Sequence, residues 1–356
     1  MRNFACTNCS NEVFFENVTC LECDHALGFD PVRCKMVALE AVDEAGFRAI
    51  GDGAPSGQDP DRLAYCDNRQ HDVCNWLRPT EAASGLCLAC GLNRTIPNLA
   101  EQGSLAAWRE LELAKKRLIY SLLRFRLPMD GSKWNKGRLA FDFVRNATTG
   151  HLNGVITIDI TEADTVERVR QREHFGESYR SLLGHLRHES GHFYWTILVE
   201  AGGQLEEFRT VFGDERQDYG EALARYHESG PSPDWQEQFI SAYASSHPWE
   251  DWAETWALYL HIVDGVDTAD AEAHRLRAAG MAPPRAGGAK SGFDAYRASR
   301  VDTLIDRWLP LTIAMNSLCR SMGHEDFYSF VVPAAVDAKL AFVHRLVRSF
   351  AAQGGG

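Results

Sequence analysis

Two histidines and a glutamate in this sequence have the spacing of a hydrolytic metal site. They lie in the segment His188-Glu189-Ser190-Gly191-His192, inside a stretch of helical periodicity. Histidines four residues apart share one face of a helix, so both rings can ligate one Zn²⁺ ion, and the glutamate between them lies beside a water on that ion. We therefore expect His188 and His192 to be metal ligands and Glu189 to be the general base.

A hydrolytic zinc site needs a third protein ligand and one open position for water. The residues after His192, FYWTILVEAGG, contain no histidine, which excludes the pattern HExxHxxGxxH. The alternative is a carboxylate from a second helix, and Glu250 and Glu254 lie four residues apart in such a segment. We expect Glu250 to be the third ligand and Glu254 to accept a hydrogen bond from the distal ring nitrogen of a ligand histidine.

Nine of the ten cysteines lie within the first 90 residues, with no export signal before them, so bound metal explains them better than disulfides. One set of four comprises Cys6, Cys9, Cys20 and Cys23, and the other comprises Cys66, Cys74, Cys87 and Cys90. Four thiolates surround Zn²⁺ completely and leave no position for chemistry, so both sites should be structural. Buried thiols, iron–sulfur clusters and ligation by His25 or His71 are the alternatives, but paired CxxC knuckles favour zinc.

The composition changes along the 356 residues. Residues 1–96 are rich in Cys, Gly and Asp and lack a long helical period, which predicts a small β-rich zinc-ribbon domain held together by metal. Residues 97–104 are expected to be a linker, residues 105–350 a larger domain, and residues 351–356 a disordered tail. The predicted fold class is α+β, with a mainly helical larger domain that contains a short antiparallel sheet.

The larger domain is expected to position the metal site on two helices. Helices are predicted at about 179–200 and 249–263, which carry the ligands, and again at about 294–321 and 333–350, with a surface loop at 281–292. The segments 138–144 and 154–160 have strand-like apolar patterns around a turn-rich stretch and predict an antiparallel pair. An extended peptide would bind by pairing with the edge of strand 154–160.

The metal-site residues also carry a family resemblance. HESGH followed downstream by EDWAE resembles the gluzincins, and YASSHPWEDWAETWALYL is similar to a catalytic helix of lethal-factor-type peptidases. In those enzymes a tyrosine seven residues before the ligand glutamate directs its hydroxyl to the zinc-bound oxyanion, and Tyr243 occupies that position here. The resemblance implies a catalytic role for Tyr243. The alternative is a tyrosine that packs with its hydroxyl bonded locally.

The chain as a whole resembles a family of bacterial zinc-binding metallopeptidases with an N-terminal zinc ribbon. The likeness rests on the two cysteine sets, the runs VCNWL and LCLACGL and the HESGH region, and it extends over nearly the whole length. It implies a zincin-like helical domain, one catalytic and two structural zinc ions, and peptide hydrolysis in which Glu189 removes a proton from water.

The charge balance argues against nucleic acid as a partner. The chain holds 37 Lys and Arg against 49 Asp and Glu, a net charge of -12, and residues 1–95 are acidic as well. No uncharged run reaches the ~18–20 apolar residues of a membrane helix, and the first residues do not form a secretory signal. We therefore expect a cytoplasmic protein without a membrane partner.

Three functions are consistent with these residues. The first is a zinc peptidase acting on a peptide or protein substrate, in which the ribbon recruits the substrate or a protein partner. The second is a zinc-stabilised protein-interaction module with a vestigial HExxH site. The third is a zinc hydrolase of a non-peptide amide, since the motif activates water without specifying the bond. His185 and His247, which adjoin the predicted ligands, are expected to pack or to begin a helix rather than to bind metal.

Overall fold

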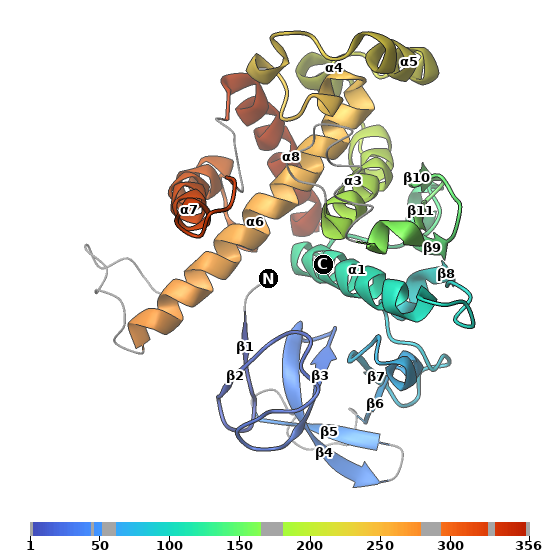
Figure 1. Cartoon of the computed structure of the whole chain (residues 1–356), viewed down its shortest axis with the longest axis vertical. Helices are drawn as coiled ribbons and strands as arrows, with labels where there is room; N and C mark the ends of the chain where they lie inside the picture. Colours follow the sequence, from blue (N-terminus) through green and yellow to red (C-terminus); the bar gives the residue numbers. More distant parts are fainter. Residues whose placement is uncertain are drawn as a thin grey trace.

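A β-rich N-terminal part precedes a largely helical remainder, as the sequence predicts (Figure 1). The computed structural model describes residues 3–43, 46–51, 62–164, 181–278, 293–326 and 332–353. In Figure 1 the N-terminal strands, in blue, lie below the helices, and one long helix crosses the larger part diagonally. The surface loop expected at 281–292 lies outside the described residues.

The N-terminal part contains two small antiparallel sheets. The first comprises β1 (Phe4–Ala5) and β2 (Glu12–Val13), and the second comprises, in spatial order, β3 (Ala26–Asp30), β4 (Lys35–Asp43), β5 (Gly46–Ile50), β6 (Leu63–Tyr65) and β7 (Leu77–Pro79). The ring of Phe29 packs against those of Phe15 and Trp76, with centroids 4.8 and 4.6 Å apart. Tyr120, from the first helix of the larger part, lies 5.9 Å from Phe15, so one aromatic cluster joins the two parts.

The larger part is built from amphipathic helices whose apolar residues meet in one core. The helices are α1 (Ser104–Phe125), α3 (Leu182–Tyr194), α4 (Leu205–Phe212), α5 (Tyr219–Ser229), α6 (Pro248–Ala278), α7 (Val301–Ser321) and α8 (Ala334–Gln353). Short 3₁₀ turns in this part are η3 (Ser132–Trp134), η4 (Ile160–Ala163), η6 (Trp235–Glu237), η7 (Tyr243–Ser245) and η8 (Ala295–Arg297), and the N-terminal part contains η1 (Asp67–His71) and η2 (Cys90–Leu92). α6 contacts α3, α4, α7 and α8. Within the described part of the chain, no helix has an apolar run long enough to cross a membrane.

The two helices expected to carry the ligands are present, with different bounds. Ser181 caps α3, and its Oγ accepts a hydrogen bond from the N–H of Gly184 at 3.0 Å. The helix continues as a π-helical turn, η5 (Trp195–Glu200), while residues 179–180 lie outside the described residues. α6 extends to Ala278, so its predicted end at 263 is wrong. The sequence pattern predicts an end there because the second half of the helix buries Asp264 and Asp267 where apolar residues would be expected.

The last two helices also differ from their predicted bounds. The expected start at 294 is wrong, since a 3₁₀ turn occupies Ala295–Arg297 and α7 begins at Val301. The tail predicted to be disordered from 351 remains helical to Gln353, and residues 354–356 lie outside the described residues. The ring of Phe350 packs 5.6 Å from that of Trp134, which gives the last turns of α8 an apolar contact.

The sheet beside these helices is mixed, so the predicted antiparallel pair is wrong. Its order is β10 (Gly150–Leu152), β11 (Val155–Asp159), β9 (Ala140–Val144) and β8 (Asn93–Thr95). The chain reverses once between β9 and β10 and again in the hairpin between β10 and β11, so β11 runs parallel to β9. β11 is therefore internal, and β10 and β8 are the two edge strands of the described sheet. β8 precedes the expected linker 97–104 yet pairs with β9, so the N-terminal part contributes a strand to this sheet.

The crossing of α3 and α6 depends on a glycine. A Cβ atom at Gly191 would lie 3.0 Å from the Cα of Ala253 and 3.1 Å from Cδ1 of Trp256. The indole of Trp252 donates to the Gly191 carbonyl oxygen at 2.8 Å, and that of Trp256 donates to Ser190 Oγ at 3.1 Å. Both indoles are fully buried, as expected of core residues, and they fix the separation of the two helices.

We predict that Gly191→Val lowers the free energy of unfolding by about 1–3 kcal/mol, because its side chain overpacks the contact with α6. Denaturant titration measures this change. The matched control is Gly220→Val on the exposed face of α5, where a Cβ would lie 3.5 Å from its nearest neighbour, Asp218 Oδ1. The control should change stability by less than about 0.5 kcal/mol. Equal effects of the two substitutions would contradict the packing argument.

Candidate active site

The structure brings the three predicted metal ligands together. His188 and His192 lie one turn apart on α3, with ring centroids 5.0 Å apart and planes at 78°. Glu250, in the first turn of α6, faces both rings: its Oε2 lies 3.0 Å from His188 Nε2 and its Oε1 lies 3.5 Å from His192 Nε2. One ligand atom from each residue lies within 4.8 Å of the others.

The donor set fits a divalent cation. Glu250 is 1% exposed, and no hydrogen bond to its Oε2 is found within the described part of the chain. Burial opposes the charge on Glu250, but the neighbouring histidines and a tyrosine hydroxyl hold its pKa down to about 2. Burial lowers the pKa of His192 to about 4, which leaves a neutral imidazole able to ligate a metal. Two imidazoles and one buried carboxylate form a ligand set typical of hydrolytic zinc.

A series of hydrogen bonds holds the His188 ring at the nitrogen that does not face Glu250. Its Nδ1 lies 2.7 Å from Glu254 Oε1, and Ser241 Oγ donates to Glu254 Oε2 at 2.7 Å. Burial opposes ionisation of Glu254, but these bonds keep its pKa below the ordinary value. When Nδ1 carries the ring proton, Nε2 presents its lone pair toward Glu250 and the cation position. The geometry thus agrees with the expected pairing of Glu254 with a ligand histidine.

Glu189 lies between the two histidines in the sequence of α3, and its side chain is partly buried. Burial raises the pKa of its carboxyl group above the ordinary value. A carboxylate with a raised pKa accepts a proton more readily near neutral pH.

His185 lies one turn before His188 and contacts a different partner. Its Nδ1 is 2.5 Å from Glu162 Oε2, and Thr149 donates to the other oxygen of that buried carboxylate. His247 immediately precedes α6, and its Nδ1 accepts a hydrogen bond from the N–H of Trp249 at 3.1 Å. These contacts account for both histidines without a role in metal binding.

Two tyrosines border the metal-ligand group. The predicted Tyr243, in η7, has its ring 6.1 Å from that of His188, and burial raises its pKa above the ordinary value. Tyr219, the first residue of α5, donates its hydroxyl to Glu250 Oε1 at 2.8 Å. Sequence reasoning missed Tyr219, because no motif or helical period connects it with Glu250.

His151 on the edge strand β10 was also missed. Its ring lies 6.3 Å from that of His192, with the planes at 16°. The N–H of Gly154 donates to His151 Nε2 at 3.0 Å, so the ring proton is on Nδ1. Burial lowers the pKa of His151 to about 4, which keeps the ring neutral. The contact places the edge of the sheet beside a predicted metal ligand.

Each four-cysteine set converges on one point. In the first set, the Sγ atoms of Cys6 and Cys23 lie 3.7 Å apart and those of Cys9 and Cys20 lie 3.6 Å apart. In the second, Cys74 and Cys87 are 3.7 Å apart, and Cys66 and Cys90 complete the cluster. A Zn–S distance of ~2.3 Å gives tetrahedral edges of about 3.8 Å, so both sets fit zinc. Cys34 and Cys319 lie outside both sets, and none of the ten cysteines, all of them described, forms a disulfide.

Helix α1 covers the second cysteine set with buried charge. Lys115 and Lys116 are 0% and 5% exposed, and Lys116 Nζ donates to the carbonyl oxygen of Val73, next to a cysteine of that set. Lys115 Nζ lies 2.7 Å from Glu112 Oε1, and Glu112 Oε2 lies 3.8 Å from Cys90 Sγ. Four thiolates around Zn²⁺ would carry a net charge of about −2, and because Glu112 neutralises Lys115, Lys116 supplies the net positive charge that α1 buries beside them. The helical part thereby supplies countercharge to the ribbon.

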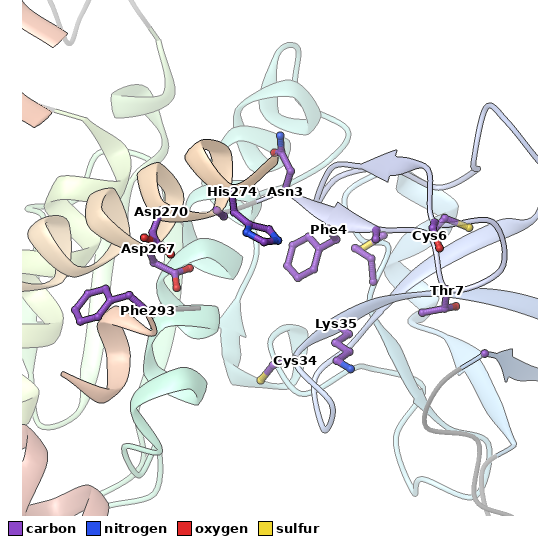
Figure 2. A pocket seen from close by; sticks show the side chains of 15 residues that line it. Asn3, Phe4, Cys6, Thr7, Cys34, Lys35, Asp267, Asp270, His274 and Phe293 are labelled. Atoms are coloured by element: carbon purple, nitrogen blue, oxygen red, sulfur yellow. The ribbon is translucent and has the colours of Figure 1, made fainter. Parts of the chain in front are cut away.

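A cavity of about 650 Å³ lies where the N-terminal part meets α6 (Figure 2). Asp267, Asp270 and His274 of α6 line one side, and Phe4 and Lys35 line the other. Among the described residues that line it, none belongs to the histidine–glutamate group. The cavity marks the junction of the two parts and is separate from the histidine–glutamate group.

Comparison with known proteins matches both parts of the chain. A family model described as "Putative zinc-binding metallo-peptidase" matches residues 104–346, and a zinc-ribbon domain model matches residues 3–101. Uncharacterized proteins of Mycobacterium tuberculosis and Mycobacterium bovis are each 41% identical over 355 residues, which cover 98% of this chain and 95% of theirs. No solved structure matches. The first family match includes both helices of the histidine–glutamate group.

We predict that Lys116→Met lowers the free energy of unfolding by about 3–5 kcal/mol, because it removes a buried cation beside the second cysteine set. It should also speed the release of zinc to a chelator. Thermal or denaturant unfolding and a chelator assay measure the two effects. Lys133→Met, at an exposed lysine, is the control and should change stability by less than about 0.5 kcal/mol. A Lys116 variant as stable as this control would refute the charge argument.

Proposed function

Because the chain belongs to a family of zinc-binding metallopeptidases, we propose that it hydrolyses peptide bonds at the site between α3 and α6. His188, His192 and Glu250 are the proposed ligands of a catalytic zinc, and the ligand set is that of a gluzincin. The observation that supports this most is the buried Glu250 carboxylate, which faces two Nε2 atoms at 3.0 and 3.5 Å. With the two cysteine sets, the proposed content is three zinc ions, two of them structural.

Glu189 is the proposed base and acid of the reaction. When bound, zinc would polarise the scissile carbonyl and lower the pKa of water from ~15.7 toward ~7. Glu189 would accept a proton from the attacking water as the new C–O bond forms. It would then donate this proton to the leaving nitrogen as the C–N bond breaks. Its raised pKa suits both transfers.

Tyr243 is the proposed donor to the oxyanion that develops on the substrate carbonyl. Its ring lies beside that of His188, and its raised pKa keeps the hydroxyl protonated at neutral pH. A hydrogen bond that forms only as charge develops on the oxygen lowers the barrier without tightening substrate binding. Loss of this hydroxyl should therefore affect kcat more than KM.

An extended peptide is the proposed substrate conformation. In the described sheet, β10 pairs with β11 alone, so its other edge offers backbone groups to a further strand. His151 places β10 beside His192, so a peptide paired with this edge would pass close to the zinc ligands. β10 thus replaces strand 154–160 as the proposed peptide-binding edge.

Glu189→Gln should lower peptide hydrolysis by at least ~10²-fold, because glutamine cannot accept the proton of water. Zinc content and thermal stability should stay at wild-type values.

Tyr243→Phe should lower kcat by ~10²–10³-fold with a smaller change in KM. A library of quenched fluorescent peptides identifies a cleaved sequence, and initial rates with that single peptide measure both effects. Tyr226→Phe, whose ring lies 5.8 Å from that of Tyr243, is the control and should retain activity.

Two outcomes would count against the proposal. Hydrolysis by Glu189→Gln at the wild-type rate would show that another group activates water. A wild-type protein loaded with three zinc ions that cleaves no peptide of a diverse library would favour the zinc-stabilised interaction module or a non-peptide amide substrate.

A further inference from the structure

Tyr219 reaches Glu250 from a helix that contributes no predicted ligand. It is the first residue of α5, and its hydroxyl donates to Glu250 Oε1 at 2.8 Å. Its ring lies 5.2 Å from His247 and 6.1 Å from Trp249, the two rings that flank the start of α6. The contact joins segments 31 residues apart.

The backbone on both sides of Tyr219 is anchored, which fixes the point from which its side chain extends to Glu250. Asp218 caps α5, and its Oδ1 accepts from the N–H of Glu221 at 2.8 Å. On the N-terminal side of Asp218, the carbonyl oxygen of Gln217 lies 3.2 Å from Nε2 of His247, the residue before α6. The start of α5 and the start of α6 are thereby tied together next to Glu250.

The hydrogen bond engages one oxygen of the carboxylate. Tyr219 bonds Oε1, while Oε2 is buried, lies 3.0 Å from His188 Nε2 and has no hydrogen bond in the described part of the chain. A glutamate has three rotatable side-chain bonds, so a ligand carboxylate needs such support to keep one oxygen directed at a metal. The two oxygens of Glu250 are therefore distinguished before any ion binds.

We propose that Tyr219 is a positioning residue that orients Glu250, so that Oε2 is presented to the metal. This inference rests on the proposed role of Glu250 as a metal ligand. It assigns different roles to the two tyrosines at the site. Tyr219 acts on a ligand and should govern metal affinity, whereas Tyr243 acts on the reacting carbonyl and should govern turnover.

The test is the metal affinity of full-length Tyr219→Phe and Tyr243→Phe proteins. Each is stripped of metal at the α3–α6 site and titrated with Co²⁺ or Zn²⁺ in competition with a chelator. Tyr219→Phe should bind both ions ~10–100-fold more weakly, with an altered Co²⁺ absorption spectrum, because the carboxylate loses its orientation. Tyr243→Phe should weaken binding less than Tyr219→Phe does, because the 2.8 Å hydrogen bond to Glu250 comes from Tyr219. The zinc of the cysteine sets, measured in parallel, shows that both variants are folded.

The possible results separate this inference from the proposed function. Wild-type affinity and an unchanged Co²⁺ spectrum in Tyr219→Phe would overturn the positioning role, whether or not the protein cleaves peptides. Weakened binding in a protein that cleaves no peptide would support the positioning role and count against the peptidase. A wild-type protein that takes up no Co²⁺ at this site would overturn both.

Discussion

The close approach of α3 and α6 at Gly191 is the constraint on which the proposed metal site depends. The missing side chain allows the two backbones to meet at Ala253, and the indoles of Trp252 and Trp256 bond to α3 on either side of that contact. His188 and His192 are thereby held opposite the first turn of α6. A wider crossing would withdraw the Glu250 carboxylate from both rings.

Three buried carboxylates of α6 are directed to different partners, which holds the helix in one rotation. Glu250 faces the histidines, Asp251 is 2.6 Å from Lys339 of α8, and Asp264 pairs with Arg187 of α3. These carboxylates are buried, and a buried carboxylate without a partner is costly. Rotating α6 would break several such pairs at once, so Glu250 is placed by the fold as well as by any bound ion.

The grouping of the two histidines with Glu250 was the part most predictable from sequence, because the spacing of His188 and His192 is a property of a single helix. Glu250 could be chosen since a hydrolytic zinc site requires a third ligand. Tyr219 and His151 could not, because they reach the site through contacts between distant segments. The sheet was predicted wrongly for a related reason: apolar alternation identifies a strand without giving its direction or its neighbour.

The central claim is that α3 and α6 hold a metal ion distinct from those of the cysteine sets. Zinc per chain tests it most directly, measured by elemental analysis on the wild type and on His188→Ala/His192→Ala, each purified without added metal. The three ligand clusters predict three zinc ions in the wild type and two in the double variant. An unchanged zinc count in the folded double variant would contradict the claim.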